Sequence, residues 1–196
     1  MITIRSRIAK SLSFTKRQQE IIVGSLLGDG HLVKTTCGYA FRVNHSIKQK
    51  EYVDWKYSEL QMFTNSFPAV YEKENSYYFK CVSHEYFSRM RKKFYLGQKK
   101  ILPTDIGKLL TPLAMAIWIM DDGTKEGNQL RINTQSFSLN ENIRLIKILE
   151  ATLGICATLN RDKNHFRLRI RDQSMMLLKQ NVLSHIVPSM RYKFSP

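Results

Sequence analysis

Two segments of this 196-residue chain resemble each other, and this repeat constrains the fold more than any other feature. The first runs from Thr15 to Gly30 and the second from Thr111 to Gly123. Each begins with a threonine suited to cap a helix, continues as an almost wholly apolar stretch, and ends in Asp-Gly. A helix that is apolar on most sides must be buried, and the terminal glycine could form a left-handed cap. We therefore predict two buried helices in equivalent places.

The spacing after these segments repeats as well. Asp29 lies 71 residues before Lys100, and Asp122 lies 71 residues before Lys193. Between these landmarks, strand-like alternation and helix-like periodicity follow each other in the same order. Strands are expected over residues 41–46, 77–82, 129–135 and 166–171, and helices over 51–63, 83–94, 140–153 and 173–186. The chain is therefore predicted to be an α+β protein of two pseudo-twofold αββαββα halves, residues 1–98 and 111–196, with a connector over 99–110.

Composition indicates what kind of partner such a chain binds. The 31 basic and 16 acidic residues give a net charge of +15, which favours a polyanion, although solubility alone is the simpler alternative. An apolar content of 43% argues against disorder, and no run is long enough to span a membrane, so a membrane partner is not expected. Three cysteines without a C-x-x-C pair favour an intracellular protein. A basic, acid-free start leaves an organelle or a bacterial cytoplasm open.

The predicted strands carry an unusual polar face. In residues 129–135 the side chains of Gln129, Arg131 and Asn133 share one face, because side chains alternate along a strand. Solvent exposure is the plain interpretation, but arginine reads guanine and asparagine or glutamine reads adenine through paired hydrogen bonds in the major groove. The predicted DNA-binding residues are Arg42, Asn44, Ser46, Gln129, Arg131, Asn133, Arg167, Arg169 and Arg171.

Asp29 and Asp122 occupy unusual positions. A helix carboxyl terminus has partial negative charge, so an aspartate there is unfavourable unless a cation offsets it. Carboxylate and carbonyl oxygens together suit Mg²⁺, whereas a plain Asp-Gly turn is the alternative. Gly24 and Gly28, four residues apart, would let the two helices approach closely and bring both aspartates to one centre.

These residues resemble the LAGLIDADG homing endonucleases in their single-chain, two-motif form. Ile22–Gly30 matches the motif at its glycine and aspartate positions, and Met115–Gly123 matches it with Ile117 in place of the first glycine. The residues around the second motif are similar to the branch found in group I introns. The resemblance covers nearly the whole chain and implies an antiparallel β saddle over DNA with the two motif helices packed at its centre.

The resemblance also implies roles for individual residues. Asp29 and Asp122 would be metal ligands, and Gly28 and Asp121 would contribute only their backbone carbonyls. Gln135 would orient water in the second half. In the first half, Ser46 or His45 takes that position, and neither is glutamine.

A basic residue late in each repeat would organise solvent around the phosphates. Lys193 matches this residue in the second half, and Lys100 matches it in the first, with Lys99 as the alternative. Gln135, Lys100 and Lys193 are therefore candidate catalytic residues together with Asp29 and Asp122.

The function implied is Mg²⁺-dependent hydrolysis of both strands of a long DNA site, with Ca²⁺ or Mn²⁺ as possible substitutes for the cofactor. Because one chain holds both motifs, it is expected to work as a monomer. Two alternatives remain: a maturase that acts on its host intron RNA, and a DNA-binding regulator that has lost cleavage.

Overall fold

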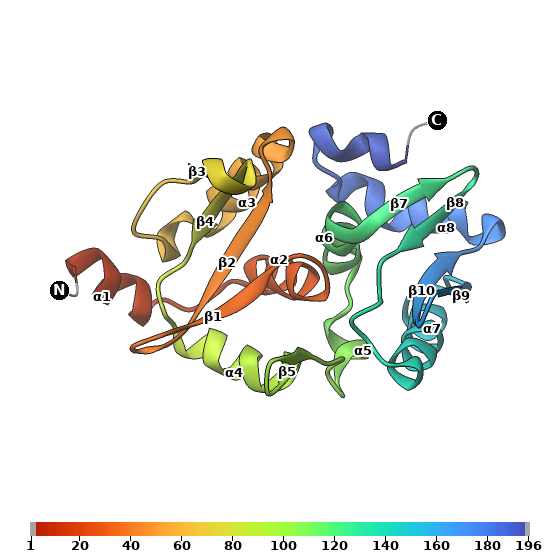
Figure 1. The fold of residues 1–196 in the computed structure, drawn as a ribbon, viewed down its shortest axis with the longest axis horizontal. Coiled ribbons are helices and arrows are strands. Elements are labelled where there is room, and N and C mark those ends of the chain that lie inside the picture. The colour runs from red at the N-terminus through yellow and green to blue at the C-terminus, as the bar shows by residue number, and fades with distance from the viewer. Residues whose placement is uncertain (1–2, 195–196) are drawn as a thin grey trace.

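The computed structural model describes residues 3–194, which form two halves of the same topology (Figure 1). The first half contains α1 (Ile4–Ser11), α2 (Lys16–Leu27), β1 (His31–Thr35), β2 (Gly38–Ser46), α3 (Lys50–Leu60), β3 (Ala69–Tyr71), β4 (Ser76–Lys80) and α4 (Glu85–Phe94). The chain then passes through β5 (Tyr95–Leu96), β6 (Lys99–Lys100) and α5 (Ile106–Leu109). The second half contains α6 (Pro112–Asp122), β7 (Gly123–Glu126), β8 (Gln129–Ile132), α7 (Leu139–Leu153), β9 (Ala157–Asp162), β10 (His165–Ile170), α8 (Asp172–Val182) and the 3-10 helix η5 (Pro188–Lys193).

The two sheets are antiparallel and have equivalent strand orders, β1-β2-β4-β3 and β7-β8-β10-β9. Each half therefore follows the predicted αββαββα order from its motif helix onward, and the α+β prediction is confirmed. Helices α3 and α4 pack on the first sheet, and α7 and α8 pack on the second. In Figure 1 the motif helices α2 and α6 lie between the two sheets.

The motif helices begin where the sequence predicted. The Thr15 hydroxyl accepts from the Gln18 backbone while the Gln18 side chain accepts from the Thr15 backbone, which forms a capping box. The Thr111 hydroxyl caps α6 by accepting from the Ala114 backbone, with Pro112 in the first turn, where a missing N–H has no cost. These two caps fix where each buried helix starts and therefore where its aspartate falls.

The helices cross at Gly24. A Cβ placed on Gly24 would lie 2.4 Å from the Ala114 carbonyl oxygen and 2.6 Å from the Ile117 Cβ. A side chain there would push the helices apart, so glycine is required for their contact. Every residue of α6 from Leu113 to Asp121 is buried, because α6 is enclosed on all sides.

One expectation about the helix ends is wrong. Neither Gly30 nor Gly123 has a positive φ, and Gly123 is extended, with φ −73° and ψ 140°. Glycine is needed there for space, because a Cβ would lie 2.6 Å from the Ile119 carbonyl oxygen. The close return of β7 past the end of α6, rather than backbone handedness, selects this residue.

The predicted strands differ from the observed ones mainly at their ends. β8 stops at Ile132, so Asn133 and Gln135 follow the strand instead of belonging to it. β10 stops at Ile170, and Arg171 is the N-cap of α8. Helix α1 and the exposed strand β3 had no clear pattern in the sequence. Within residues 3–194 no helix combines the length and apolar character needed to cross a membrane.

Candidate active site

The carboxylates of Asp29 and Asp122 lie where the two motif helices end. Asp29 follows α2 and has 48% of its side chain exposed, while Asp122 is the last residue of α6. Asp29 also lines an open groove of about 410 Å³, together with Asn44 and Ser46 of β2. A polyanion lying on β2 would therefore reach this carboxylate.

Both carboxylates are held in an environment that disfavours their charge. Desolvation and the neighbouring Asp121 raise the pKa of Asp29 to about 6. Desolvation and the charges of Asp29 and Asp121 raise the pKa of Asp122 to about 8. Mutual repulsion between acids at one site is the arrangement that a bound cation relieves.

Two lysines approach the same helix ends from late in each repeat. The Lys100 ammonium donates to the Gly28 carbonyl oxygen at 2.5 Å. The Lys193 ammonium donates to the carbonyl oxygens of Gly123 at 2.7 Å and Asp121 at 3.4 Å. The two lysines thus take equivalent places, as the equal spacing in the sequence suggested. Burial lowers the pKa of both, and the nearby aspartates oppose that change.

Asp121 does more than the sequence indicated, because its side chain is also part of the site. The carboxylate has no exposed surface and accepts from Lys56 Nζ at 2.8 and 3.1 Å and from the Tyr52 hydroxyl at 2.7 Å. Burial and the charge of Asp121 raise the pKa of Tyr52 well above its usual value, so its hydroxyl remains a donor. Sequence reasoning missed Lys56 and Tyr52. The available signal was a lysine on the apolar face of α3, between Tyr52, Val53 and Leu60.

The Asp121 carboxylate also reaches the first motif. Its Oδ2 accepts from the Asp29 backbone N–H at 3.2 Å. A Cβ on Gly28 would lie 2.5 Å from the Asp121 Cβ, so this glycine leaves the space that the carboxylate fills. The two helix ends are therefore connected through one side chain.

The structure distinguishes between the two first-half candidates. His45 points into the protein, with Nδ1 3.5 Å from Asp29 Oδ2, whereas Ser46 is exposed at the end of β2. Desolvation and Lys56 lower the pKa of His45 to about 4, so the imidazole is neutral at pH 7. In the second half, the Gln135 amide donates to Asp162 Oδ2 at 3.1 Å, at the end of β9.

The exposed face of each sheet brings positive charges together. In the strand register Arg42 pairs with Lys80, and Arg131 pairs with Arg169. Like charges directly opposite each other destabilise a sheet. Two arginines have anionic partners, Arg131 with Glu126 at 2.5 Å and Arg167 with Asp162 at 2.7 Å. Within residues 3–194, Arg42, Lys80 and Arg169 have no acidic partner among the ion pairs of these two sheets.

The same faces hold polar atoms that lack partners. Buried side-chain atoms without a hydrogen bond include Arg42 Nε, Asn44 Oδ1, Gln129 Oε1, Arg131 Nε, Arg167 Nε and Arg169 Nε. All six belong to residues that the alternation along the strands assigned to DNA reading. Buried polar groups are normally satisfied, so these six atoms are exceptions to that rule among the described residues.

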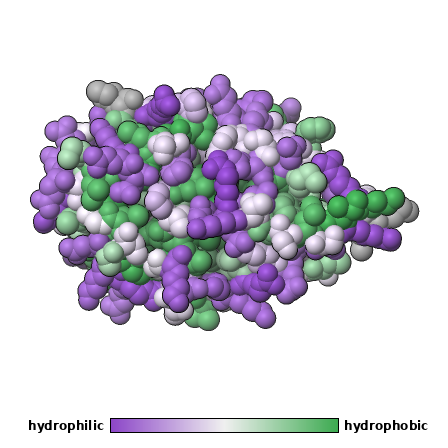
Figure 2. All heavy atoms as spheres, turned by 180° about the vertical axis from the view of Figure 1, so that it is seen from behind, coloured by the Kyte–Doolittle hydropathy of each residue, from purple (hydrophilic) through white to green (hydrophobic). Residues whose placement is uncertain are grey.

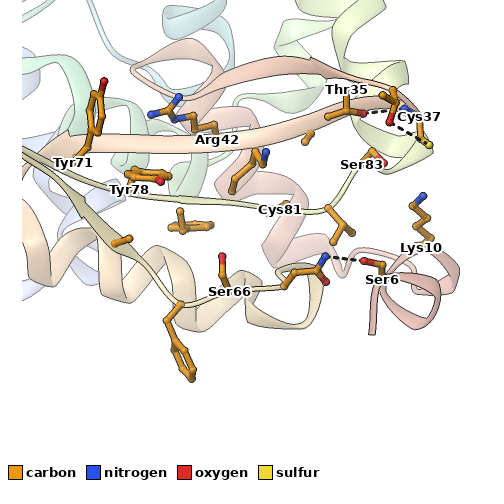
Figure 3. A pocket seen from close by; sticks show the side chains of 18 of the residues that line it. Ser6, Lys10, Thr35, Cys37, Arg42, Ser66, Tyr71, Tyr78, Cys81 and Ser83 are labelled. Carbon is orange, nitrogen blue, oxygen red and sulfur yellow. Dashed lines mark hydrogen bonds between the residues drawn. The ribbon is translucent and has the colours of Figure 1, made fainter. Parts of the chain in front are cut away.

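A second groove continues this surface away from the helix ends. It measures about 790 Å³ and is lined by Arg42, Tyr78 and Lys80 of the sheet and by Lys10 of α1. The Arg42 guanidinium lies 4.7 Å above the Tyr78 ring. Figure 3 shows Arg42 and Tyr78 near one end of the groove, and Lys10, Ser6 and Cys37 near the other.

Comparisons with known proteins agree with this geometry. The sequence profile of the LAGLIDADG DNA endonuclease family matches residues 19–178. The cytochrome b mRNA maturase bI2 of Debaryomyces hansenii is 31% identical over 192 residues, which cover 91% of this chain and 73% of the relative. The DNA endonuclease I-ChuI of Chlamydomonas applanata is 27% identical, over 94% of this chain and 97% of the relative.

Solved structures share the fold. The homing endonuclease I-WcaI bound to its DNA recognition sequence has a TM-score of 0.88 at 23% identity, covering 96% of this chain and 91% of that one. I-DmoI in complex with DNA and Mn has a TM-score of 0.57 at 16% identity, covering 88% and 99%. The family profile matches most of the length of this chain, and both motif helices are present. This chain therefore belongs to the LAGLIDADG DNA endonuclease family.

Proposed function

We propose that this protein is a site-specific endonuclease that hydrolyses both strands of a long DNA site with a divalent cation, acting as a monomer. The observation that carries the proposal is the duplicated arrangement at the helix ends, where each motif aspartate lies beside a lysine bonded to backbone carbonyls. A single chain thus supplies two centres, one for each strand.

The donor set suits Mg²⁺, with Mn²⁺ or Ca²⁺ as substitutes. Asp29 and Asp122 offer carboxylate oxygens whose pKa values are raised by burial and by the neighbouring carboxylates. Hard oxygen ligands of this kind, with phosphate oxygens completing the site, are typical for Mg²⁺. A cation held there would activate water and stabilise the leaving 3′-oxygen. The Gly28 and Asp121 carbonyls, proposed as further ligands, accept from the two lysines in this structure.

The remaining roles fall to side chains of this chain. Lys100 and Lys193 place positive charge beside the reacting phosphates, where it would offset the charge that develops in the transition state. Gln135 would exchange its bond to Asp162 for a water molecule in the second centre. In the first centre Ser46 stands at the matching position, four residues beyond the matching arginine, while His45 lies beside Asp29.

Sequence recognition would come from the faces of both sheets. Arg42 and Asn44 in the first half, and Gln129 and Arg131 in the second, are of the residue types that bond base edges in the major groove. Asn133, Arg167, Arg169 and Arg171 extend the second surface, and Ser46 extends the first.

Cleavage of a randomised duplex library tests the proposal. Incubation with Mg²⁺, followed by sequencing of the cut ends, should recover one long preferred sequence cut on both strands. The Asp29→Asn and Asp122→Asn variants should bind that sequence and leave it without double-strand cuts. A wild-type protein that binds a preferred duplex and cuts neither strand, in Mg²⁺ or Mn²⁺, would overturn the proposal.

The relation to an mRNA maturase favours a second candidate, binding of the host intron RNA. The two functions separate experimentally, because RNA binding does not require the motif carboxylates. An Asp29→Asn/Asp122→Asn variant that still promotes splicing of its intron would support this second role alongside, or in place of, cleavage.

A further inference from the structure

The two centres are unequal, because among residues 3–194 a buried ionic network lies beside the first and the equivalent buried residues of the second, such as Thr134, are uncharged. On the first-half side it consists of Lys56, Tyr52 and His45, and Asp121 enters it from the second half. Lys56 and Asp121 have no exposed side-chain surface, and His45 has 2%. Ionic groups this deep are costly to desolvate, so their presence requires an explanation.

The buried lysine has no ionic equivalent in the second half. Counted from the matching arginines, Tyr52 and Lys56 lie 10 and 14 residues after Arg42, and at the same distances after Arg131 the chain has Glu141 and Leu145. Leu145 is fully buried in α7, and Glu141 caps the start of that helix. Thr134 takes the place of His45, three residues beyond the matching arginine, and Gly28 takes the place of Asp121. The same fold is thus built with a buried leucine in place of Lys56, so packing alone does not require the buried lysine.

The network reaches Asp29 by two routes. The direct route is the hydrogen bond from the Asp29 backbone N–H to Asp121 Oδ2, at 3.2 Å. It fixes the backbone that carries the motif carboxylate. No bond of this kind can form in the opposite direction, because Gly28 has no side chain to accept from the Asp122 backbone.

The second route passes through His45. Lys56 Nζ lies 3.4 Å from His45 Nε2, and an ammonium group can only donate, so Nε2 accepts. The ring proton is then on Nδ1, which lies 3.5 Å from Asp29 Oδ2. Lys56 therefore sets the tautomer that directs an N–H group toward the Asp29 carboxylate.

We propose that Asp121, Lys56 and His45 are positioning residues for the Asp29 centre alone, and that they set the rate at which one DNA strand is cut relative to the other. This inference rests on the endonuclease function proposed above. It extends that function, because it assigns a role to a side chain that the motif does not require.

The test measures the two cuts separately. Two duplexes of the recovered target, each already nicked in one strand, report cleavage of the other strand under single-turnover conditions with enzyme in excess. Lys56→Met/Asp121→Ala removes both charges together and leaves no lone buried ion. We expect it to slow one strand by about 10–100-fold, which is typical when support for a metal ligand is lost. The other strand should stay within about 3-fold, and the dissociation constant for DNA should change little.

A conservative variant supplies the rescue. Lys56→Met/Asp121→Asn keeps an oxygen that can accept from the Asp29 backbone, so it should recover most of the lost rate on the same strand. His45→Leu should slow that strand too. Leu60→Ala is the matched control, because Leu60 is fully buried one turn from Lys56 on the same helix. It should leave the ratio of the two strand rates unchanged.

The outcomes are distinct. Equal slowing of both strands, no slowing, or the same change of ratio in Leu60→Ala would overturn the inference while leaving the endonuclease function intact. A wild-type protein that cuts neither nicked duplex would overturn both.

Discussion

Asp122 carries a proton in the folded protein at pH values where the unfolded chain has lost it. Its pKa of about 8 in the folded state exceeds the value of about 4 expected for an exposed aspartate. Between these two values Asp122 binds more protons in the folded state than in the unfolded state, so its contribution to stability falls as pH rises from about 4 to about 8. The metal-free protein is therefore under electrostatic strain near neutral pH.

Asp122→Asn should remove that strain. We expect the Tm of the variant, without divalent cations, to exceed that of wild type by about 2–6 °C at pH 8, and the difference to shrink toward pH 4. Thermal unfolding across this range checks the sign. Asp105→Asn is an opposite control, because the hydrogen bond from Lys93 lowers the pKa of Asp105 and its loss should not stabilise the protein. A constant difference between Asp122→Asn and wild type from pH 4 to 8 would contradict the raised pKa.

Lys99 and Lys100 allow a test of the catalytic lysine against a neighbouring lysine as its control. They are adjacent in β6, but Lys100 reaches the Gly28 carbonyl while Lys99 is exposed. Lys100→Met should reduce single-turnover cleavage by about 10²–10³-fold, the usual cost of losing a group that stabilises transition-state charge. Lys99→Met should cut within a few-fold of wild type. The reverse order would assign the role to Lys99.

The helical segment η5 holds the end of the described chain against the rest of the protein. A chain end is usually dispensable, yet Phe194 is buried and Lys193 bonds two carbonyls at the end of α6. Tyr192, by contrast, is 56% exposed, and its hydroxyl accepts from Gln49 at 3.3 Å. One aromatic residue of the pair therefore anchors the segment, and the other links it to the first half.

Truncation after Arg191 should keep most DNA affinity, because one positive charge of the excess is lost, and remove most cleavage. Lys193→Met should behave in the same way with the segment intact. Cleavage of a bound target within a few-fold of wild type by Lys193→Met would show that the contacts to Gly123 and Asp121 have no role in the reaction.

Helix α1 has few buried residues, and it lies at one end of the proposed DNA-binding surface. Only Ser6 and Ala9 are buried, and Asn65 donates to the Ser6 hydroxyl at 2.7 Å. In Figure 2 this end of the molecule projects with apolar atoms on its surface, and Ile4 is 76% exposed. The helix places Lys10 at the far end of the groove that begins near Arg42.

Lys10→Ala should weaken DNA binding a few-fold and reduce the salt slope by about one, as expected for one phosphate contact. Cleavage of the bound target should not change. Lys147→Ala, on the outer surface of α7, is the charge-matched control and should alter neither quantity. Equal effects of the two substitutions would show that Lys10 acts only through net charge.

The whole molecule should bind DNA with a steep dependence on salt. A net charge of +15 and two positively charged sheet faces would neutralise about ten phosphates of a long site. The logarithm of the association constant should then fall with the logarithm of salt concentration at a slope near −9. Arg131→Ala should instead cost about 1–3 kcal/mol at one base position and relax specificity there. A uniform loss across all sequences would show that Arg131 contacts only the backbone.

Local rules explain what could be predicted from the sequence. The capping box at Thr15 and the alternation around Arg42 depend on residues a few positions apart, so a single sequence shows them. The contact between Asp121 and Lys56 joins residues 65 positions apart in different halves, and no local pattern encodes it. Strand β3 was missed because its three residues are all exposed and so carry no apolar alternation.

The pairing of Lys56 with Asp121 also determines how the halves can associate. Suppose that the halves were expressed separately. A dimer of two first halves would bury two copies of Lys56, each facing Gly28 where it needs an aspartate. A dimer of two second halves would bury two copies of Asp121 without a lysine. An unpaired buried charge strongly destabilises an interface. A mixture of the separated halves should therefore form pairs of one first half and one second half rather than pairs of identical halves. The Lys56–Asp121 pair would thus prevent a duplicated protein from associating as a symmetric dimer of either half.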